Sequence, residues 1–118
     1  MPTFKESLSF AVKGIQIFLE EKHMKVHTVI AVLVVIAGLM FKITITEWLM
    51  CLFLKGLVIG FEIINTAIEN LVNLVSPDYH PLAGKVKDLA AGAVLLAACI
   101  AAIGGVLIFG KYILALLN

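Results

Sequence analysis

The sequence predicts an all-α integral membrane protein in which an N-terminal amphipathic surface helix precedes three transmembrane helices. Of its 118 residues, 62% are hydrophobic and only 14% are charged, and the mean hydropathy is +1.10. A soluble domain is roughly 45–50% apolar and about 25% charged. Three apolar stretches also reach the roughly 20 residues that cross a hydrocarbon core. One membrane domain over residues 1–118 is therefore expected.

The surface helix is predicted over residues 4–25. Apolar residues such as Phe4, Leu8 and Ile15 recur there at helical spacing among lysines and glutamates. This amphipathic pattern is typical of a helix that lies in the head-group plane of a membrane.

The three spans are predicted at residues 26–45, 48–75 and 86–112. Trp48, which begins the second span, is a residue type enriched at membrane interfaces. The Ser-Pro-Asp-Tyr-His-Pro segment at 76–81 reads as a loop, because two prolines and several turn-forming residues end a helix.

Lysines in the short flanking segments predict the orientation. Two of them, Lys42 and Lys111, flank the spans on one side. The other side carries Lys5, Lys13, Lys22, Lys25, Lys85 and Lys87. The positive-inside rule then places the N-terminus and the 76–87 loop in the cytoplasm, so an active site there would face the cytoplasm from the cell membrane. Lys55 lies inside the second span, where two alternatives stay open: its side chain snorkels to the interface, or it pairs with Glu47, which is two turns away and only loosely in reach.

Four polar residues form a stripe along the second span. Glu62, Asn65, Glu69 and Asn73 follow one another at spacings of three, four and four residues, which places them on one helix face. A charged side chain in a membrane span costs on the order of 2.5–3.5 kcal/mol, so such residues indicate function by default. Counting about 20 residues from the start of the span puts Glu62 just inside the cytoplasmic boundary and Glu69 at it. The stripe suits chemistry on a lipid head group with a soluble co-substrate.

The residues near this boundary offer the groups that phosphoryl transfer needs. Carboxylate and amide oxygens are ligands that Mg²⁺ prefers, a lysine compensates phosphate charge, and a further carboxylate can take the proton of a hydroxyl. The residues available are Glu21, Glu62, Asn65, Glu69, Asp78, His80, Lys87 and Asp88. Structural alternatives stay open, because buried glutamates can fix helix packing and Asp88 can favour a helix N-terminus.

Two further motifs occur in the apolar stretches. Residues 105–111 match the first seven positions of a P-loop, but Tyr112 follows instead of Ser or Thr and no strand precedes the motif, so a P-loop is rejected. Gly56 and Gly60 form a GxxxG pattern, which permits close helix packing within or between subunits. Three spans are few for enclosing a site, which favours a homo-oligomer.

Three segments together match the pattern of one family. They are Glu62-Ile-Ile-Asn-Thr-Ala-Ile-Glu69, Tyr79-His-Pro-Leu-Ala83 and Lys87-Asp-Leu-Ala-Ala-Gly-Ala-Val94. On these residues the chain resembles the prokaryotic diacylglycerol kinase family over essentially its whole length. Residues 21–27 and 41–48 look like the branch that contains undecaprenol kinases.

The resemblance implies a homotrimeric membrane kinase with composite sites between subunits, Mg²⁺ as cofactor and ATP as co-substrate. It implies that Glu62 is the catalytic base and that Glu21 and Glu69 hold the metal. The nucleotide-binding residues that it implies are Asn65, Asp78, Tyr79, His80, Lys87 and Asp88. The chain departs from the family pattern at Asn73, where Asp is usual, and at Lys25, where Arg is common.

The expected function is ATP-dependent phosphorylation of a lipid alcohol in the membrane. The preferred acceptor is undecaprenol, giving undecaprenyl phosphate, and the alternative is diacylglycerol, giving phosphatidic acid. The competing class is a small proton- or cation-coupled transporter that uses Glu62 or Glu69. The loop that carries His80 and Lys87 favours the kinase, because a carrier has no need of it. The net charge of +1 gives no reason to expect a nucleic-acid partner.

Overall fold

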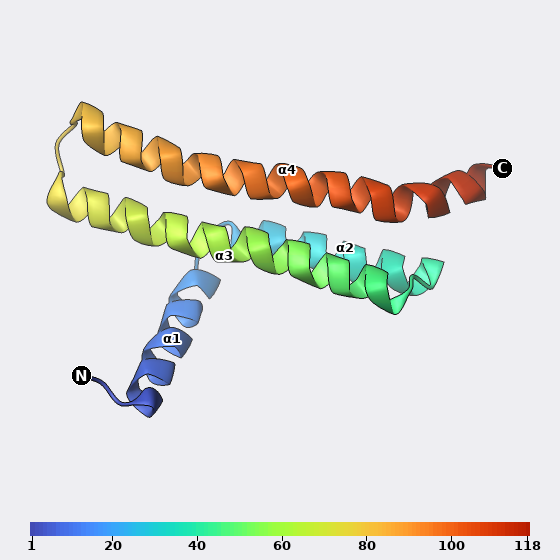
Figure 1. The fold of residues 1–118 in the computed structure, drawn as a ribbon, viewed down its shortest axis with the longest axis horizontal. Helices are drawn as coiled ribbons and strands as arrows, with labels where there is room; N and C mark the ends of the chain where they lie inside the picture. Colours follow the sequence, from blue (N-terminus) through green and yellow to red (C-terminus); the bar gives the residue numbers. More distant parts are fainter. The chain divides into compact units, whose positions relative to one another are not determined.

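A computed structural model describes all 118 residues and contains four helices. They are α1 (Phe4–Leu19), α2 (Met24–Phe41), α3 (Ile45–Val75) and α4 (Pro81–Leu117) (Figure 1). The helices α2, α3 and α4 are each long and apolar enough to cross a membrane. The expected all-helical fold with three candidate spans is therefore confirmed. The chain divides into two compact units, Met1–Ile36 and Ala37–Asn118.

In the first unit, α1 begins with a capping box. The backbone N–H of Glu6 donates to the Thr3 hydroxyl oxygen at 3.2 Å, and the Thr3 N–H donates to the Glu6 carboxylate at 3.0 Å. These two bonds satisfy amides that have no partner within the helix. The side chains of Thr3 and Glu6 therefore define where α1 begins.

The helix α1 ends at Leu19, whereas the sequence predicted a surface helix over 4–25. The N–H groups of Glu20 and Glu21 donate to carbonyls three residues back, at 3.2 and 3.0 Å. Such short-range bonds tighten the last turn of a helix and commonly end it. The polar turn at 20–23 then leads directly into α2, which begins at Met24, two residues before the predicted first span.

In the second unit, two local capping motifs form the turn between α2 and α3. Lys42 lies in the left-handed region, with φ 52°, and the Ile43 N–H donates to the Gly38 carbonyl at 3.1 Å, as in a Schellman cap. Thr44 and Glu47 then form a capping box, with bonds of 2.9 and 3.1 Å, that starts α3. These motifs explain why α2 ends at Phe41 rather than at the predicted residue 45.

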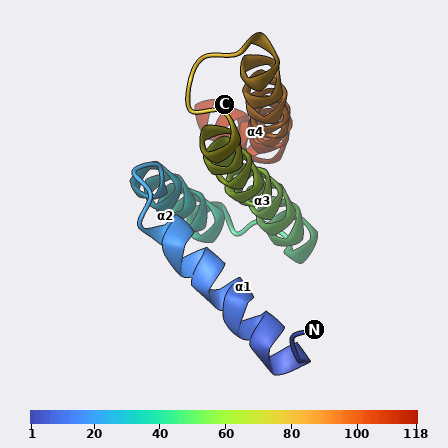
Figure 2. The same cartoon turned by 90° about the vertical axis from the view of Figure 1, so that its left-hand side faces the viewer.

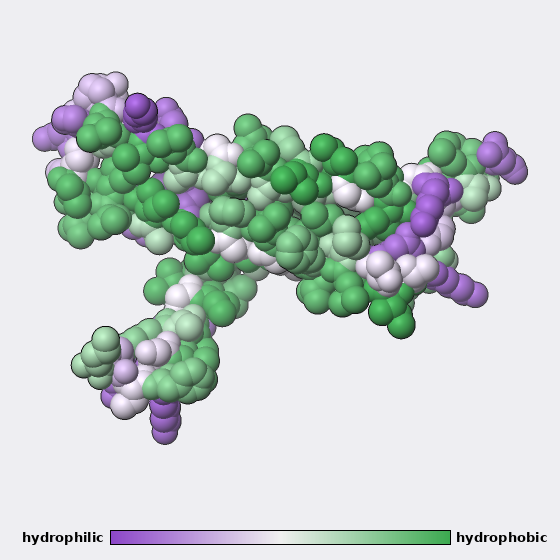
Figure 3. Space-filling view, viewed as in Figure 1, coloured by the Kyte–Doolittle hydropathy of each residue, from purple (hydrophilic) through white to green (hydrophobic).

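Helices α3 and α4 form an antiparallel hairpin joined by the loop at 76–80. Figure 2 views the hairpin from the end that carries this loop. At 1.5 Å per residue they are about 46 and 55 Å long, so both extend beyond a hydrocarbon core of about 30 Å. Leu54, Val58, Ala97 and Ile108 are buried in this unit. Most other large apolar side chains of the two helices are exposed, and hydrophobic residues cover the length of the hairpin between hydrophilic ends (Figure 3). Such a surface fits a lipid environment.

Small residues allow close packing in the same unit. A Cβ atom added to Gly38 would lie 2.6 Å from the Cζ2 atom of the Trp48 ring, and one added to Gly104 would overlap the side chain of Leu54. Membrane helices use glycines in this way to bring neighbours into contact. The ring of Trp48 therefore packs against the last turns of α2 at Gly38.

Glu47 connects α3 to the far end of α4. Its carboxylate accepts a hydrogen bond from the Tyr112 hydroxyl and lies 2.8 Å from the Lys111 ammonium. The Tyr112 ring stacks on Phe41 at a centroid distance of 5.5 Å. The partner of Glu47 is thus Lys111, and not Lys55, which the sequence had offered as a distant candidate.

Substitution Gly38→Ala is expected to lower the thermal midpoint of unfolding, because the added methyl group overlaps the rigid Trp48 ring. Overpacking of this kind costs about 1–3 kcal/mol. Thermal unfolding of the purified protein in detergent measures the shift. Gly105→Ala is the matched control, since nothing lies within 4 Å of a Cβ atom there. An equal fall in the thermal midpoint of both variants would contradict the Trp48 contact.

Substitution Lys42→Gly is expected to raise the thermal midpoint, because glycine adopts a positive φ without the steric cost that lysine bears. The net gain should be about 0.5–1 kcal/mol after the larger chain entropy of glycine is subtracted. Lys42→Ala removes the same charge but keeps the Cβ atom, so it should not stabilise the protein. A gain in the alanine variant as large as that in the glycine variant would rule out backbone conformation as the cause.

Candidate active site

The predicted polar stripe lies on one unbroken helix. Glu62, Asn65, Glu69 and Asn73 all belong to α3, and together they extend over about 16 Å of its axis. Glu62 and Asn65 are half-buried, while Glu69 and Asn73 are exposed. The stripe therefore changes from a partly enclosed to an open environment towards the 76–80 loop.

Asn65 and Glu69 contact each other one turn apart. The Asn65 Nδ2 group donates to Glu69 Oε1 at 3.1 Å. The Asn65 Oδ1 atom is buried and has no hydrogen-bond partner. An unsatisfied buried acceptor costs about 1–3 kcal/mol unless a water, ion or ligand satisfies it. The Asn65 side chain thus faces the Glu69 carboxylate through Nδ2, while its Oδ1 atom is enclosed by the protein.

A lysine from α4 completes the stripe. The Lys87 ammonium donates to Asn73 Oδ1 at 2.6 Å, across the hairpin. Lys87 is half-buried, and Asp88, the next residue, is exposed. This bond holds a cation at the face of α3 that carries Glu69, so oxygen ligands and a positive charge occupy one end of the hairpin.

The loop at 76–80 is held by local bonds. The Ser76 hydroxyl donates to the Asp78 carbonyl oxygen at 3.1 Å, and His80 caps α4 by accepting the Leu82 N–H at its Nδ1 atom, also at 3.1 Å. The side chains of Asp78 and Tyr79 are exposed, that of Tyr79 by 89%. Both are therefore available to a ligand that approaches from water.

An open, mainly apolar hollow of about 400 Å³ lies where the last turns of α3 meet the first turns of α4. It is lined by Val72, Val75 and Val86 among others, with Ser76 and His80 at its polar edge. Val72 and Val86 are sequence neighbours of Asn73 and Lys87. The hollow thus adjoins the end of the stripe where the lysine is held.

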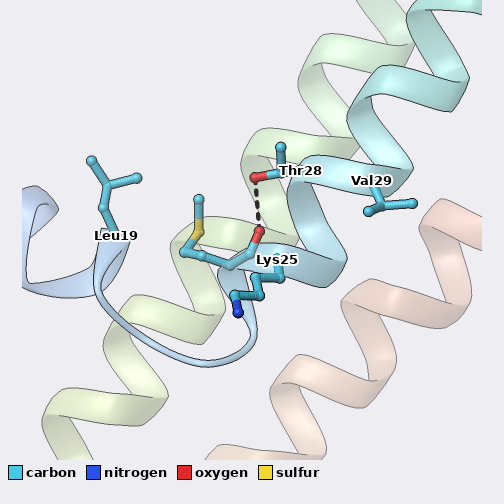
Figure 4. A pocket seen from close by; sticks show the side chains of 5 residues that line it. Leu19, Lys25, Thr28 and Val29 are labelled. Atoms are coloured by element: carbon cyan, nitrogen blue, oxygen red, sulfur yellow. Dashed lines mark hydrogen bonds between the residues drawn. The ribbon is translucent and has the colours of Figure 1, made fainter.

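The first unit contains a second hollow of about 500 Å³ at the connection between α1 and α2 (Figure 4). Leu19, Met24, Lys25, Thr28 and Val29 line it, and the Thr28 hydroxyl donates to the Met24 carbonyl at 2.8 Å. Lys25 is the one charged residue in this lining. The hollow therefore combines an apolar wall with a single cation.

The oxygen atoms near Glu69 fit a magnesium ion. Mg²⁺ prefers hard oxygen ligands and commonly combines one or two carboxylates with substrate phosphates and water. The exposed Glu69 carboxylate offers such a ligand, and Asn65, one turn away, holds it by a hydrogen bond. The chain gathers no group of three or more His, Cys, Asp and Glu side chains that could hold a metal. Glu21, the other predicted ligand, belongs to the first unit, where it is half-buried in the turn after α1.

Two contacts in this region were not foreseen from the sequence. In the sequence, Asn73 stands out only as a departure from the family pattern, and nothing there indicates its bond to Lys87. A hairpin folded at residues 76–80 would have brought these two residues opposite each other. The cap formed by His80 also has a sequence signal, because Pro81 follows it and proline is favoured at the first position of a helix.

The chain matches known proteins over most of its length. The sequence profile of the family described as prokaryotic diacylglycerol kinase matches residues 9–109. An undecaprenol kinase from Bacillus subtilis (strain 168) is 42% identical over 89 residues, which are 75% of this chain and 72% of that protein. A diacylglycerol kinase from Synechocystis sp. is 36% identical over 106 residues, which are 88% of this chain and 61% of that protein. The chain belongs to the prokaryotic diacylglycerol kinase family, and it is a membrane lipid kinase.

Proposed function

We propose that the protein transfers the γ-phosphoryl group of ATP to the hydroxyl of undecaprenol, giving undecaprenyl phosphate. The observation that carries this proposal is the Lys87–Asn73 bond, which holds a cation beside the carboxylate-bearing face of an apolar helix. The relative named undecaprenol kinase, at 42% identity, supports the choice of lipid. The product would carry the new phosphate at the membrane surface.

Glu62 is the proposed catalytic base. Its carboxylate takes the proton of the lipid hydroxyl while the hydroxyl oxygen bonds to the γ-phosphorus and the bond from this phosphorus to the bridging oxygen breaks, leaving ADP. Glu62 is half-buried on α3, two turns deeper than Glu69. This position suits a lipid hydroxyl, which reaches the base from the bilayer side.

The phosphates of ATP are proposed to lie between α3 and the start of α4. Glu21 and Glu69 are the proposed ligands of Mg²⁺, which, when bound, would neutralise phosphate charge. Asn65 would donate or accept hydrogen bonds at the phosphates, and Lys87 would compensate their charge. Asp88 is proposed to act beside Lys87.

The base and sugar of the nucleotide are proposed to lie near the 76–80 loop. The apolar hollow of about 400 Å³ beside this loop supports the placement, since a purine ring needs an apolar surface. The exposed side chains of Asp78 and Tyr79 would flank the nucleotide together with His80.

The proposed assembly is a homotrimer in the cytoplasmic membrane, with the whole chain forming one kinase domain. The helix α1 would lie in the head-group plane, and the active site would face the cytoplasm. The lysine distribution and the many exposed apolar side chains support these assignments. Gly56 and Gly60, which have open space around them, would let helices of neighbouring subunits approach closely.

The lipid preference can be measured directly. Purified protein in lipid bilayers is expected to move radiolabel from γ-labelled ATP to undecaprenol, with a higher kcat/KM than for diacylglycerol presented at the same surface density. A higher kcat/KM for diacylglycerol would assign the alternative, which the 36% identical diacylglycerol kinase favours. No transfer to either alcohol would contradict both choices of acceptor.

Substitution Glu62→Gln is expected to lower kcat by about 10²–10⁴-fold, because the amide cannot accept the hydroxyl proton. Binding of ATP, measured by equilibrium titration, should stay within about twofold of wild type, since the change lies outside the proposed nucleotide site. Glu20→Gln is the matched control, because Glu20 is exposed and has no proposed role. Loss of ATP binding in Glu62→Gln would make Glu62 a ligand rather than the base.

A further inference from the structure

The bond between Lys87 and Asn73 has an unusual charge balance. The donor is a charged ammonium group, whereas the acceptor, at 2.6 Å, is the oxygen of a neutral amide. An amide oxygen fixes the direction of a cation without cancelling its charge, as a carboxylate would. The contact therefore positions Lys87 and leaves its full positive charge available.

Neither Asp88 nor the dipole of α4 cancels the charge of Lys87. Asp88 follows Lys87 directly, and consecutive residues on a helix point in different directions. Lys87 also lies in the second turn of α4, beyond the first turn in which a helix dipole acts, so the dipole does not offset its charge.

The position of the cation along α3 is also defined. Asn73 lies one turn from Glu69 on the same face, and residues four apart on a helix have Cβ atoms about 5–6 Å from each other. Lys87 is thus held about one helix turn from Glu69 and about two turns from Asn65 along α3. This spacing suits a phosphate that contacts the lysine on one side and oxygen-bound metal on the other.

We propose that Asn73 is a positioning residue that directs the Lys87 ammonium at a phosphate of ATP while leaving the charge uncancelled. The inference rests on the proposed function, since it assigns the anion to the nucleotide. Two properties of the Asn73 side chain contribute to this role. The acceptor oxygen holds the lysine, and the neutrality of the amide preserves its charge.

The first property is tested with Asn73→Leu, which keeps the approximate size of the side chain but removes the acceptor. The KM for ATP is expected to rise about tenfold, as for loss of one charge-assisted hydrogen bond. The kcat and the KM for the lipid alcohol should stay within about twofold of wild type. Asn70→Leu, the same change at an exposed residue of the same helix, is the matched control and should behave as wild type.

The second property is tested with Asn73→Asp, which keeps an acceptor but adds a negative charge. Its carboxylate is expected to pair with Lys87, raise the KM for ATP about threefold at low ionic strength and flatten the dependence of this KM on salt. A KM and a salt dependence equal to those of wild type would overturn the role assigned to neutrality.

The remaining outcomes separate this inference from the proposed function. If wild type phosphorylates a lipid alcohol and Asn73→Leu matches Asn70→Leu in its KM for ATP, the positioning role is wrong and the function stands. If Asn73→Leu lowers the thermal midpoint and kcat while the KM for ATP is unchanged, the contact is only a structural clamp, and the inference fails. If wild type neither binds ATP nor phosphorylates a lipid alcohol, the proposed function fails, and the inference fails with it.

Discussion

Polar side chains on membrane helices need partners within the protein, and this constraint organises the α3–α4 hairpin. The polar contacts between the two helices lie at opposite ends of the hairpin, where Glu47 meets Lys111 and Asn73 meets Lys87. Nearly the same number of residues separates the two contacts along each helix, so one register satisfies both. Between them, apolar side chains such as Leu54, Val58 and Ala97 are buried. The candidate site depends on this register, because its cation and its carboxylates come from different helices.

The stripe on α3 divides the proposed chemistry by depth. A lipid hydroxyl can approach a half-buried carboxylate such as Glu62 from the bilayer, whereas the charged phosphates of ATP are too costly to place in hydrocarbon. Glu69 and Lys87 lie nearer the loop end, where water can reach the nucleotide. One straight helix thus provides two environments, and its regular geometry sets the distance between them.

The sequence predicted the helices well because their signals are local or cumulative. Apolar length indicated the three candidate spans, and the i, i+3, i+4 spacing placed the stripe on one face. The ends of α1 and α2 were less predictable, because they depend on turn geometry. Lys42 occupies a left-handed position at which glycine is usual, and nothing in its neighbours marks it. The Glu47–Lys111 and Asn73–Lys87 contacts join distant positions, so they required the register of the hairpin. The catalytic and ligand roles of the site residues stay predictions.

The cap that His80 provides has a consequence for its tautomer. Since Nδ1 accepts the Leu82 N–H, the proton of a neutral imidazole resides on Nε2. The nitrogen that remains for a ligand, Nε2, is then an N–H donor. While α4 stays capped in this way, His80 can recognise lone pairs, such as those of phosphate oxygens or purine nitrogens. It cannot offer a lone pair of its own, so coordination of a metal ion by His80 would require the start of α4 to give up its cap.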